Sequence, residues 1–188
     1  MRLAPALLVA ALLPAVAARA DQVFLREVDA PRALFGDGVT SERKTLELSD
    51  AELSELSRQV GRRVDARAYP YLEVSEPGRG ARSPLGYIFL LDVLGQNLPI
   101  TFAVGIKADG AVQDVQVMVY REPHGGEIRE RRFRAQFSGR RVGQPLVIGK
   151  DVDAISGATI SSHSAAYAVR KGLGLADILR RRAGQKAP

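Results

Sequence analysis

The sequence predicts an α+β fold, with one domain built on an antiparallel β-meander and flanking helices, after a signal peptide. Three observations support this prediction. Three apolar, β-branched segments separated by short turns lie between residues 87 and 119. Helical apolar stripes occur on both sides of these segments. The composition, with 46% hydrophobic and 26% charged residues in a chain of 188, is that of a globular domain.

The first residues have the layout of a secretory signal peptide. Met1-Arg2 is a positively charged start, Leu3–Ala18 is an uncharged run rich in Ala and Leu, and Ala18-Arg19-Ala20 has the small-x-small pattern of a cleavage site. A retained membrane anchor is the alternative, but the run is shorter than the ~20 residues of a span and contains Pro5 and Pro14. We expect cleavage and a periplasmic or other extracytoplasmic location, with membrane anchoring if the segment stays uncleaved.

The chain is expected to divide into four parts. Residues 1–20 are the signal peptide, 21–80 an N-terminal α/β extension packed on the main domain, 81–180 the main domain, and 181–188 a C-terminal tail. The boundary near residue 80 follows from Glu76-Pro77-Gly78-Arg79-Gly80, whose Pro and Gly content is typical of a loop.

The chain has no cysteine and only two histidines, His124 and His163. This excludes disulfides, thiol redox chemistry and cysteine-ligated metal or haem sites, and it disfavours a histidine metal site. Residues 1–20 hold two of the 27 basic residues and none of the 21 acidic ones, so the remainder has a net charge of +4. Arginines are concentrated in Arg129–Arg141. They predict either a solvated basic face or a docking site for an anionic partner, and we expect no nucleic acid as partner of an exported protein.

The N-terminal half contains one well-signalled helix. Ser49 and Glu52 form a capping-box pattern, and Gly61 is placed to end the helix. Between them, the apolar residues Leu53, Leu56 and Val60 fall on one stripe. The preceding residues 43–48 alternate as a short strand does.

The meander follows from residues 87–93, 99–106 and 112–119. Gly95-Gln96-Asn97 forms the first turn, and Asp109-Gly110 is a strong hairpin signal for the second. Three strands joined by short turns are expected at the centre of the sheet. After them, Phe133 and Phe137 are spaced to pack inward from a short helix that Gly139 ends.

Small and hydroxyl residues then precede a helix expected from about Ser162 to Lys171. From the residues alone, two interpretations stay open. Ser161 or Ser162 caps the helix with Gly157 in a turn, or the free amides and positive dipole of the helix start bind a phosphate next to a threonine hydroxyl.

At this point the sequence resembles the FMN-binding domain family. Asp153-Ala154-Ile155-Ser156-Gly157-Ala158-Thr159 is similar to the family's flavinylation motif, found in extracytoplasmic flavin subunits of the Rnf and sodium-pumping NADH:quinone oxidoreductase complexes and in soluble exported carriers. The resemblance implies that a flavin transferase attaches FMN, taken from FAD, to Thr159 through a phosphoester. Ser156, Gly157 and Ala158 would let the backbone approach the phosphate and ribityl chain. Asp153 would shape the turn or help the transferase recognise the segment.

The resemblance extends over roughly residues 87–179. Glu122-Pro123-His124-Gly125-Gly126 corresponds to a family loop near the flavin ring, so Glu122, Pro123, His124 and Gly125 are implied cofactor-binding residues. His124 follows Pro123 where the family pattern has glycine. Gln136-Phe137-Ser138-Gly139 is similar to a further family element. Tyr87, Tyr120, His124 and Tyr167 are candidate neighbours of the ring, with core packing or surface exposure as the alternative.

The resemblance implies an exported flavoprotein that relays electrons between membrane and periplasmic partners, a redox carrier more than a stand-alone enzyme. The alternative is a non-flavin binding or assembly module of the same fold, which would use Arg129–Arg141 for docking. A hydrolase that pairs His163 with Ser156, Ser161 or Ser162 is disfavoured, because the sequence has no G-x-S-x-G nucleophile elbow.

Overall fold

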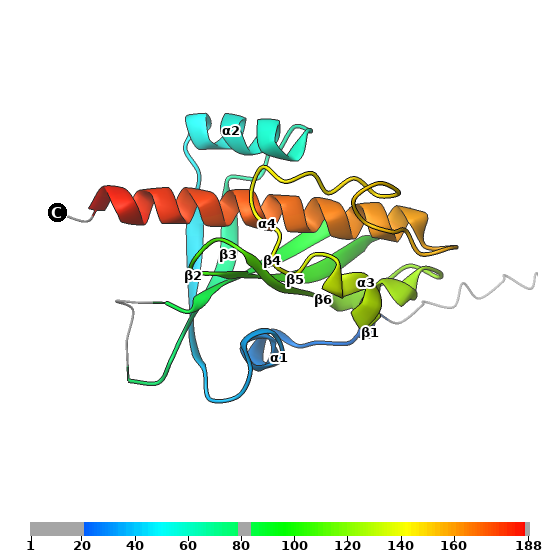
Figure 1. The fold of residues 1–188 in the computed structure, drawn as a ribbon, viewed down its shortest axis with the longest axis horizontal. Helices are drawn as coiled ribbons and strands as arrows, with labels where there is room; N and C mark the ends of the chain where they lie inside the picture. Colours follow the sequence, from blue (N-terminus) through cyan, green and yellow to red (C-terminus); the bar gives the residue numbers. More distant parts are fainter. Residues whose placement is uncertain (1–20, 79–83, 187–188) are drawn as a thin grey trace, which may run out of the picture.

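The fold is given by a computed structural model that describes residues 21–78 and 84–186. In these residues six strands form one antiparallel sheet in the order β1-β6-β5-β4-β3-β2 (Figure 1). The predicted meander is confirmed as its centre, β4-β5-β6, and the predicted α+β class is confirmed with it. The signal-peptide prediction concerns residues 1–20, which lie outside the described residues.

The strands are β1 (Gln22–Val23), β2 (Thr40–Glu47), β3 (Ala68–Ser75), β4 (Gly86–Leu94), β5 (Pro99–Lys107) and β6 (Val112–Tyr120). The α-helices are α1 (Ala30–Phe35), α2 (Asp50–Val60), α3 (Arg131–Ala135) and α4 (Thr159–Lys186), and 3-10 turns occur at Glu27–Asp29 and Gly126–Arg129. No helix within 21–78 and 84–186 is both long and apolar enough to cross a bilayer.

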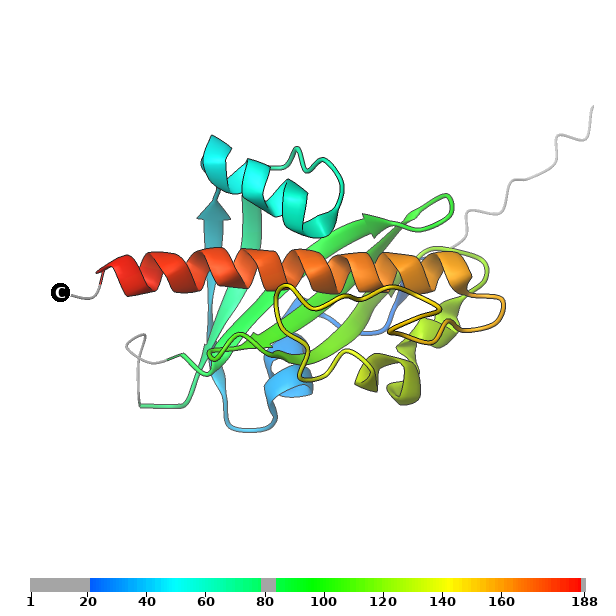
Figure 2. The same ribbon diagram turned by 45° about the horizontal axis from the view of Figure 1, so that its top comes forward.

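Helices cover both faces of the sheet. The 28-residue α4 lies across one face with α2 beside it, and α1 lies against the other face (Figures 1 and 2). Successive residues of β4 therefore enter different cores: Phe89 packs on the α4 side and Ile88 on the α1 side. Burial on both faces explains why residues 87–91 form a continuous apolar run instead of alternating with polar residues, up to the exposed Asp92.

Strand β6 departs from the predicted spacing. Val115 and Val117, two residues apart, belong to the core on the α4 side, as expected for one face of a strand. Val112 joins the same core although it lies three residues from Val115, because the register shifts between Gly105 and Ile106. The register also shifts between Thr101 and Phe102, so Val119 packs against the core on the α1 side instead. A β-bulge is the physical reason, because an extra residue moves the following side chains to the other face.

The helix predicted at Ser49 is confirmed as α2. The backbone N–H of Glu52 donates to the Ser49 hydroxyl over 3.4 Å, and the Ser49 N–H donates to the Glu52 carboxylate over 2.8 Å. Gly61 ends the helix in the left-handed conformation, with φ of 75°. The preceding strand, β2, begins three residues earlier than the predicted residue 43.

The C-terminal helix is longer than predicted. It begins at Thr159 and continues to Lys186, so residues 181–186 are helical. Gly172 and Gly174 suggest a helix end near Lys171, but in the structure both glycines lie inside the helix, where neighbouring elements pack closely against them. A Cβ on Gly172 would lie 2.7 Å from Val104 of β5, and one on Gly174 would lie 2.6 Å from Leu56 of α2.

Candidate functional site

Thr159 is the first residue of α4, and its side chain is exposed. The turn before it is fixed locally. The Ala158 N–H donates to the Ile155 carbonyl over 2.9 Å, and Gly157 has a φ of 79° that favours glycine. The Ser162 hydroxyl donates to the Ala158 carbonyl over 2.9 Å and accepts the Ile155 N–H over 3.4 Å. The rigid turn thus presents the Thr159 hydroxyl at the helix start.

Neither Ser161 nor Ser162 caps α4, as one interpretation of the sequence required. Both lie inside its first turn, because the helix begins at Thr159 and not near Ser162. In the described part of the chain, the backbone amides of Thr159, Ile160 and Ser161 have no hydrogen-bond acceptor, and the first turn holds no acidic residue. These amides and the helix dipole favour an anion next to the Thr159 hydroxyl.

A pocket of about 220 Å³ adjoins this helix start. It brings together two segments that are distant in the sequence. Its lining consists of Gln96, Glu122, Pro123, His124 and residues 157–161. Of the predicted cofactor-binding residues, Glu122, Pro123, His124, Gly157, Ala158 and Thr159 line it. The exposed residues Asp153 and Ser156 lie outside its lining, in the segment that leads to it.

Glu122 connects the pocket to the β4–β5 turn. Its side chain is buried, and one carboxylate oxygen accepts the backbone N–H of Asn97 over 2.5 Å and of Leu98 over 2.9 Å. Burial acts to raise the pKa of Glu122, but hydrogen bonds from this turn outweigh it and lower the pKa. The second oxygen, Oε2, is buried without a partner among the described residues. Glu122 therefore fixes the turn and keeps one acceptor free.

Tyr120 holds two lining residues of the pocket, His124 and Ser161, in place. Its hydroxyl lies 2.8 Å from the Ser161 hydroxyl and donates to the His124 carbonyl. Gly125 is required here, because its φ is 92° and a Cβ would come within 2.7 Å of the Ser161 Oγ. Burial raises the pKa of Tyr120. Tyr120 thus joins the loop after β6 to the first turn of α4.

Gln136 holds the segment that leads to Thr159. Its Oε1 accepts the Asp153 N–H over 2.7 Å, and its Nε2 donates to the Asp153 carbonyl over 3.4 Å. Arg140 donates to the Asp151 carbonyl over 3.0 Å. These bonds explain why the Gln136 element accompanies the motif at 153–159. In Figure 2, the long connection after α3 runs alongside α4.

Several arginines of 129–141 have partners inside the molecule. Arg134 pairs with Asp114 at 2.5 Å, and Arg141 pairs with Asp109 at 2.7 Å. Arg129 lies over the ring of Phe24, 3.9 Å from its centroid. The stretch is therefore only partly the solvated basic face that the sequence predicted.

The other candidates lie apart from the pocket or lack the geometry. Tyr87 packs against Tyr71, with 6.0 Å between ring centroids, and Tyr167 packs under Arg62. No hydrogen bond joins a serine to exposed His163 in the part of the chain that the structure describes, so the proposed Ser–His pair is not formed there. The same residues hold no cluster of three or more His, Asp or Glu for a metal ion.

Comparison with known proteins gives two positive findings. Residues 95–174 match the FMN-binding domain family. The crystal structure of Shewanella oneidensis NqrC is similar at 16% identity and a TM-score of 0.47, and the match covers 80% of this chain and 88% of that one. No curated protein matches the chain. The motif at 153–159 and the loop at 122–125 both lie within the matched region. Over residues 95–174 the chain therefore matches the FMN-binding domain, the family that the motif at 153–159 resembles.

Proposed function

We propose that the chain is an exported electron carrier and that Thr159 bears its FMN through a phosphoester. One observation carries the proposal: the threonine of the motif is exposed at the start of α4, inside the matched region and beside three amides that have no acceptor in the described part of the chain. The phosphodiester that joins Thr159 to the flavin would carry a negative charge, which the amides and the helix dipole would stabilise.

The residues of the pocket fit FMN in two further respects. Glu122 lines the pocket, and its buried Oε2, which has no partner among the described residues, is an acceptor that suits a hydroxyl or N–H donor of the ribityl chain or ring. Gly157 and Ala158 are small, so they leave the Thr159 hydroxyl accessible. The bound flavin would supply the one- or two-electron redox chemistry, and the protein would fix its position and solvent exposure.

A threonine hydroxyl is a weak nucleophile, and no general base is bonded to Thr159 among the residues described. The attachment therefore requires a flavin transferase. That enzyme would form the bond between Thr159 Oγ1 and the FMN phosphorus of FAD, break the pyrophosphate bond with AMP as leaving group, and take up the hydroxyl proton. Redox donors and acceptors at the membrane or in the periplasm would be the further partners.

Intact mass spectrometry after coexpression with a flavin transferase tests the proposal. We expect the wild type to gain the mass of one FMN less one water and to stay yellow after denaturation. Thr159→Ala should gain nothing, and Thr159→Ser should keep some label because it retains the hydroxyl. Thr40→Ala, at an exposed threonine of β2, is the matched control and should label fully.

A wild type with no added mass, in cells where the transferase labels a known substrate, would refute the flavin proposal and favour the non-flavin binding module. The same spectrum tests export separately. Protein recovered from the periplasm should begin at Asp21, and a chain that keeps Met1 would contradict cleavage while leaving the flavin question untouched.

A further inference from the structure

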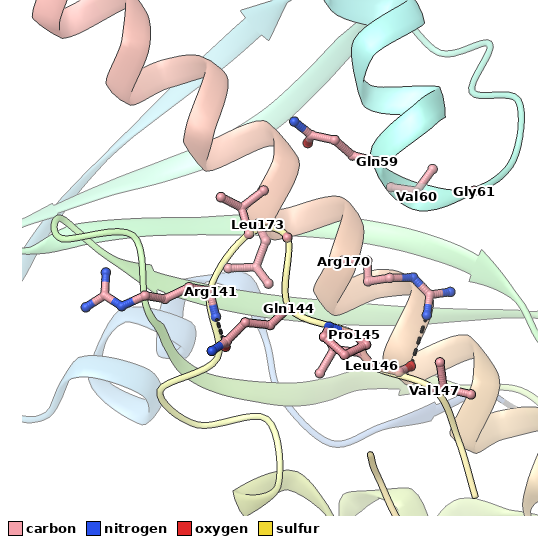
Figure 3. A pocket seen from close by; sticks show the side chains of 12 residues that line it. Gln59, Val60, Gly61, Arg141, Gln144, Pro145, Leu146, Val147, Arg170 and Leu173 are labelled. Atoms are coloured by element: carbon pink, nitrogen blue, oxygen red, sulfur yellow. Dashed lines mark hydrogen bonds between the residues drawn. The ribbon is translucent and has the colours of Figure 1, made fainter. Parts of the chain in front are cut away.

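A second pocket, of about 500 Å³, lies between the end of α2, residues 141–147 and the middle of α4 (Figure 3). Its volume is in the range of small-molecule sites. Arg170, which lines it, follows Thr159 by eleven residues on α4, about 16 Å at the helical rise. The pocket therefore differs from the site at Thr159.

The walls of this pocket are mainly apolar. Val60, Leu146 and Leu173 are nearly fully buried at its base, whereas Val142 and Val147 are 37% and 48% exposed at its rim. Large aliphatic side chains left open to solvent at a concave site favour an apolar ligand group.

The charge of the pocket has one sign. Arg141 and Arg170 are the charged residues of its lining, and no carboxylate lines it. Arg141 is already paired with Asp109. Arg170 is half-buried, and its guanidinium donates only to the Leu146 carbonyl, over 3.0 Å, in the described structure (Figure 3). A half-buried guanidinium has lost part of its hydration, so an anion that reaches it would bind more strongly than at an exposed arginine.

Two more cations, exposed Arg62 and half-buried Lys171, lie close to Tyr167, which precedes Arg170 by three residues on α4. Arg62 lies 4.4 Å from the ring centroid of Tyr167, and Lys171 lies 4.7 Å from that of Tyr69. Neither has a carboxylate within ion-pair distance among residues 21–78 and 84–186. The aromatic rings compensate these charges in part.

The pKa values distinguish these cations from an arginine that has a carboxylate partner. Burial lowers the pKa of Arg170, and burial followed by repulsion from Arg62 lowers that of Lys171. Arg182, by contrast, has its pKa raised by its hydrogen bond to Glu52. Attraction from Asp92 offsets only part of the lowering of the Lys171 pKa. The group around Tyr167 is thus positively charged and has no ion pair among the described residues.

We propose that this pocket binds an amphipathic carboxylate, with its apolar chain against Val60, Leu146 and Leu173 and its carboxylate on the Arg170 guanidinium. Arg62, over the ring of Tyr167, would add long-range attraction. The proposal goes beyond flavin binding and does not depend on it.

Isothermal titration calorimetry of the flavin-loaded, full-length protein tests the proposal, with octanoate as the probe. We expect saturable binding of one octanoate, and at least about tenfold weaker binding of 1-octanol, which has the same chain length but no charge. Acetate, which has the head group alone, should give no saturable heat. The Thr159→Ala protein should bind octanoate like the wild type, which separates this result from the flavin proposal.

Variants assign the charge to Arg170. Arg170→Met should weaken octanoate binding at least about tenfold, whereas Arg170→Lys, which keeps the charge but loses the planar donors of the guanidinium, should lose less. Arg131→Met removes a charge outside the pocket and should stay within about twofold of the wild type. If Arg170→Met fails to fold, Val147→Asp is the alternative test. Its carboxylate at the rim of the pocket would pair with Arg170, so we expect it to abolish octanoate binding.

Three results would overturn the proposal. These are a wild type that gives no saturable heat with octanoate, a folded Arg170→Met that binds octanoate as the wild type does, and 1-octanol binding as tightly as octanoate. The last result would mean that the pocket selects the chain and not the charge.

Discussion

The two ends of α4 differ in how completely their polar groups are paired. Near the C-terminal end, Arg182 donates to both carboxylate oxygens of Glu52, over 2.8 and 2.6 Å, and to the Glu47 carbonyl over 2.7 Å. At the N-terminal end, three backbone amides lack acceptors among the residues that the structure describes, and Thr159 is exposed. Full pairing indicates a structural role. Free donors next to an exposed hydroxyl indicate a site for a ligand.

The largest expected effect on the free energy of unfolding is at Gly174, where α4 packs against α2. Gly174→Ile should destabilise the fold by about 3 kcal/mol, because its Cβ would lie 2.6 Å from Leu56 and 2.7 Å from the Gln59 Oε1. Urea denaturation followed by circular dichroism measures the change. Gly184→Ile, at a site with no atom within 4 Å, is the control in the same helix. Equal losses for both variants would mean that the α2–α4 contact contributes little.

The next effect comes from the ion pair. Glu52→Gln should cost about 2 kcal/mol at pH 7, since it removes the charge that pairs with Arg182 and keeps the capping geometry. The hydrogen bond from Arg182 holds the pKa of Glu52 at about 2, well below its usual 4.5. A lowered folded pKa stabilises the protein above the unfolded value, and that stability is lost as the pH falls toward about 2.

The difference between wild type and Glu52→Gln should therefore be constant above pH 5 and shrink as the pH falls toward about 2. Thermal unfolding as a function of pH measures it. Glu130→Gln, at an exposed residue of the segment before α3, should show no such trend. A constant difference down to about pH 2 would contradict the proposed role of the Glu52 charge.

A smaller loss is expected where the loop after β6 meets α4. Tyr120→Phe should destabilise the protein by about 1 kcal/mol, because it leaves the buried Ser161 hydroxyl without its tyrosine partner. Tyr71→Phe removes a hydroxyl that has no hydrogen bond in the described structure and should cost less. Chemical denaturation compares the two, and the reverse order would show that the Tyr120 bonds are dispensable.

The smallest effect is at the proposed attachment residue. Thr159→Val should change the free energy of unfolding by less than about 0.5 kcal/mol, since the side chain is exposed and its hydroxyl has no partner among the described residues. Denaturation of the flavin-free protein measures this. A large loss would give Thr159 a structural role and weaken the contrast between the two helix ends.

Local patterns in the sequence predicted much of the fold. Ser49 and Glu52 defined a helix start, and the apolar runs with Asp109-Gly110 between the last two defined the meander. Strand β3 and helix α1 were not predicted. In β3, Pro70 interrupts the pattern, and the six residues of α1 are too few for a clear stripe. The bulge that redirects Val119 depends on pairing with β5 and leaves no mark in the sequence of β6 alone.

The candidate site was also predictable only in part, because local motifs show in the sequence and contacts between distant segments do not. The motif drew attention to Thr159, and the resemblance to Glu122–Gly125. The role of Tyr120 in joining the two segments, and the orphan oxygen of Glu122, depend on contacts across 41 and about 25 residues of sequence. The sequence predicted an end of the C-terminal helix near Lys171 and not at Lys186. Gly172 and Gly174 favour a helix end unless another element packs closely there.

By itself, the sequence determined the class of fold, the capped helix α2, the central strands and the small, hydroxyl-rich turn before Thr159. These follow from backbone preferences and apolar periodicity between neighbours in the chain. Only the tertiary structure decided that the loop at 122–125 meets the start of α4 and that Gly172 and Gly174 pack closely against Val104 and Leu56. It also decided that Arg170 lies half-buried, with no carboxylate paired to it among the described residues. Contacts of this kind depend on how separate elements pack, which no short stretch of sequence encodes.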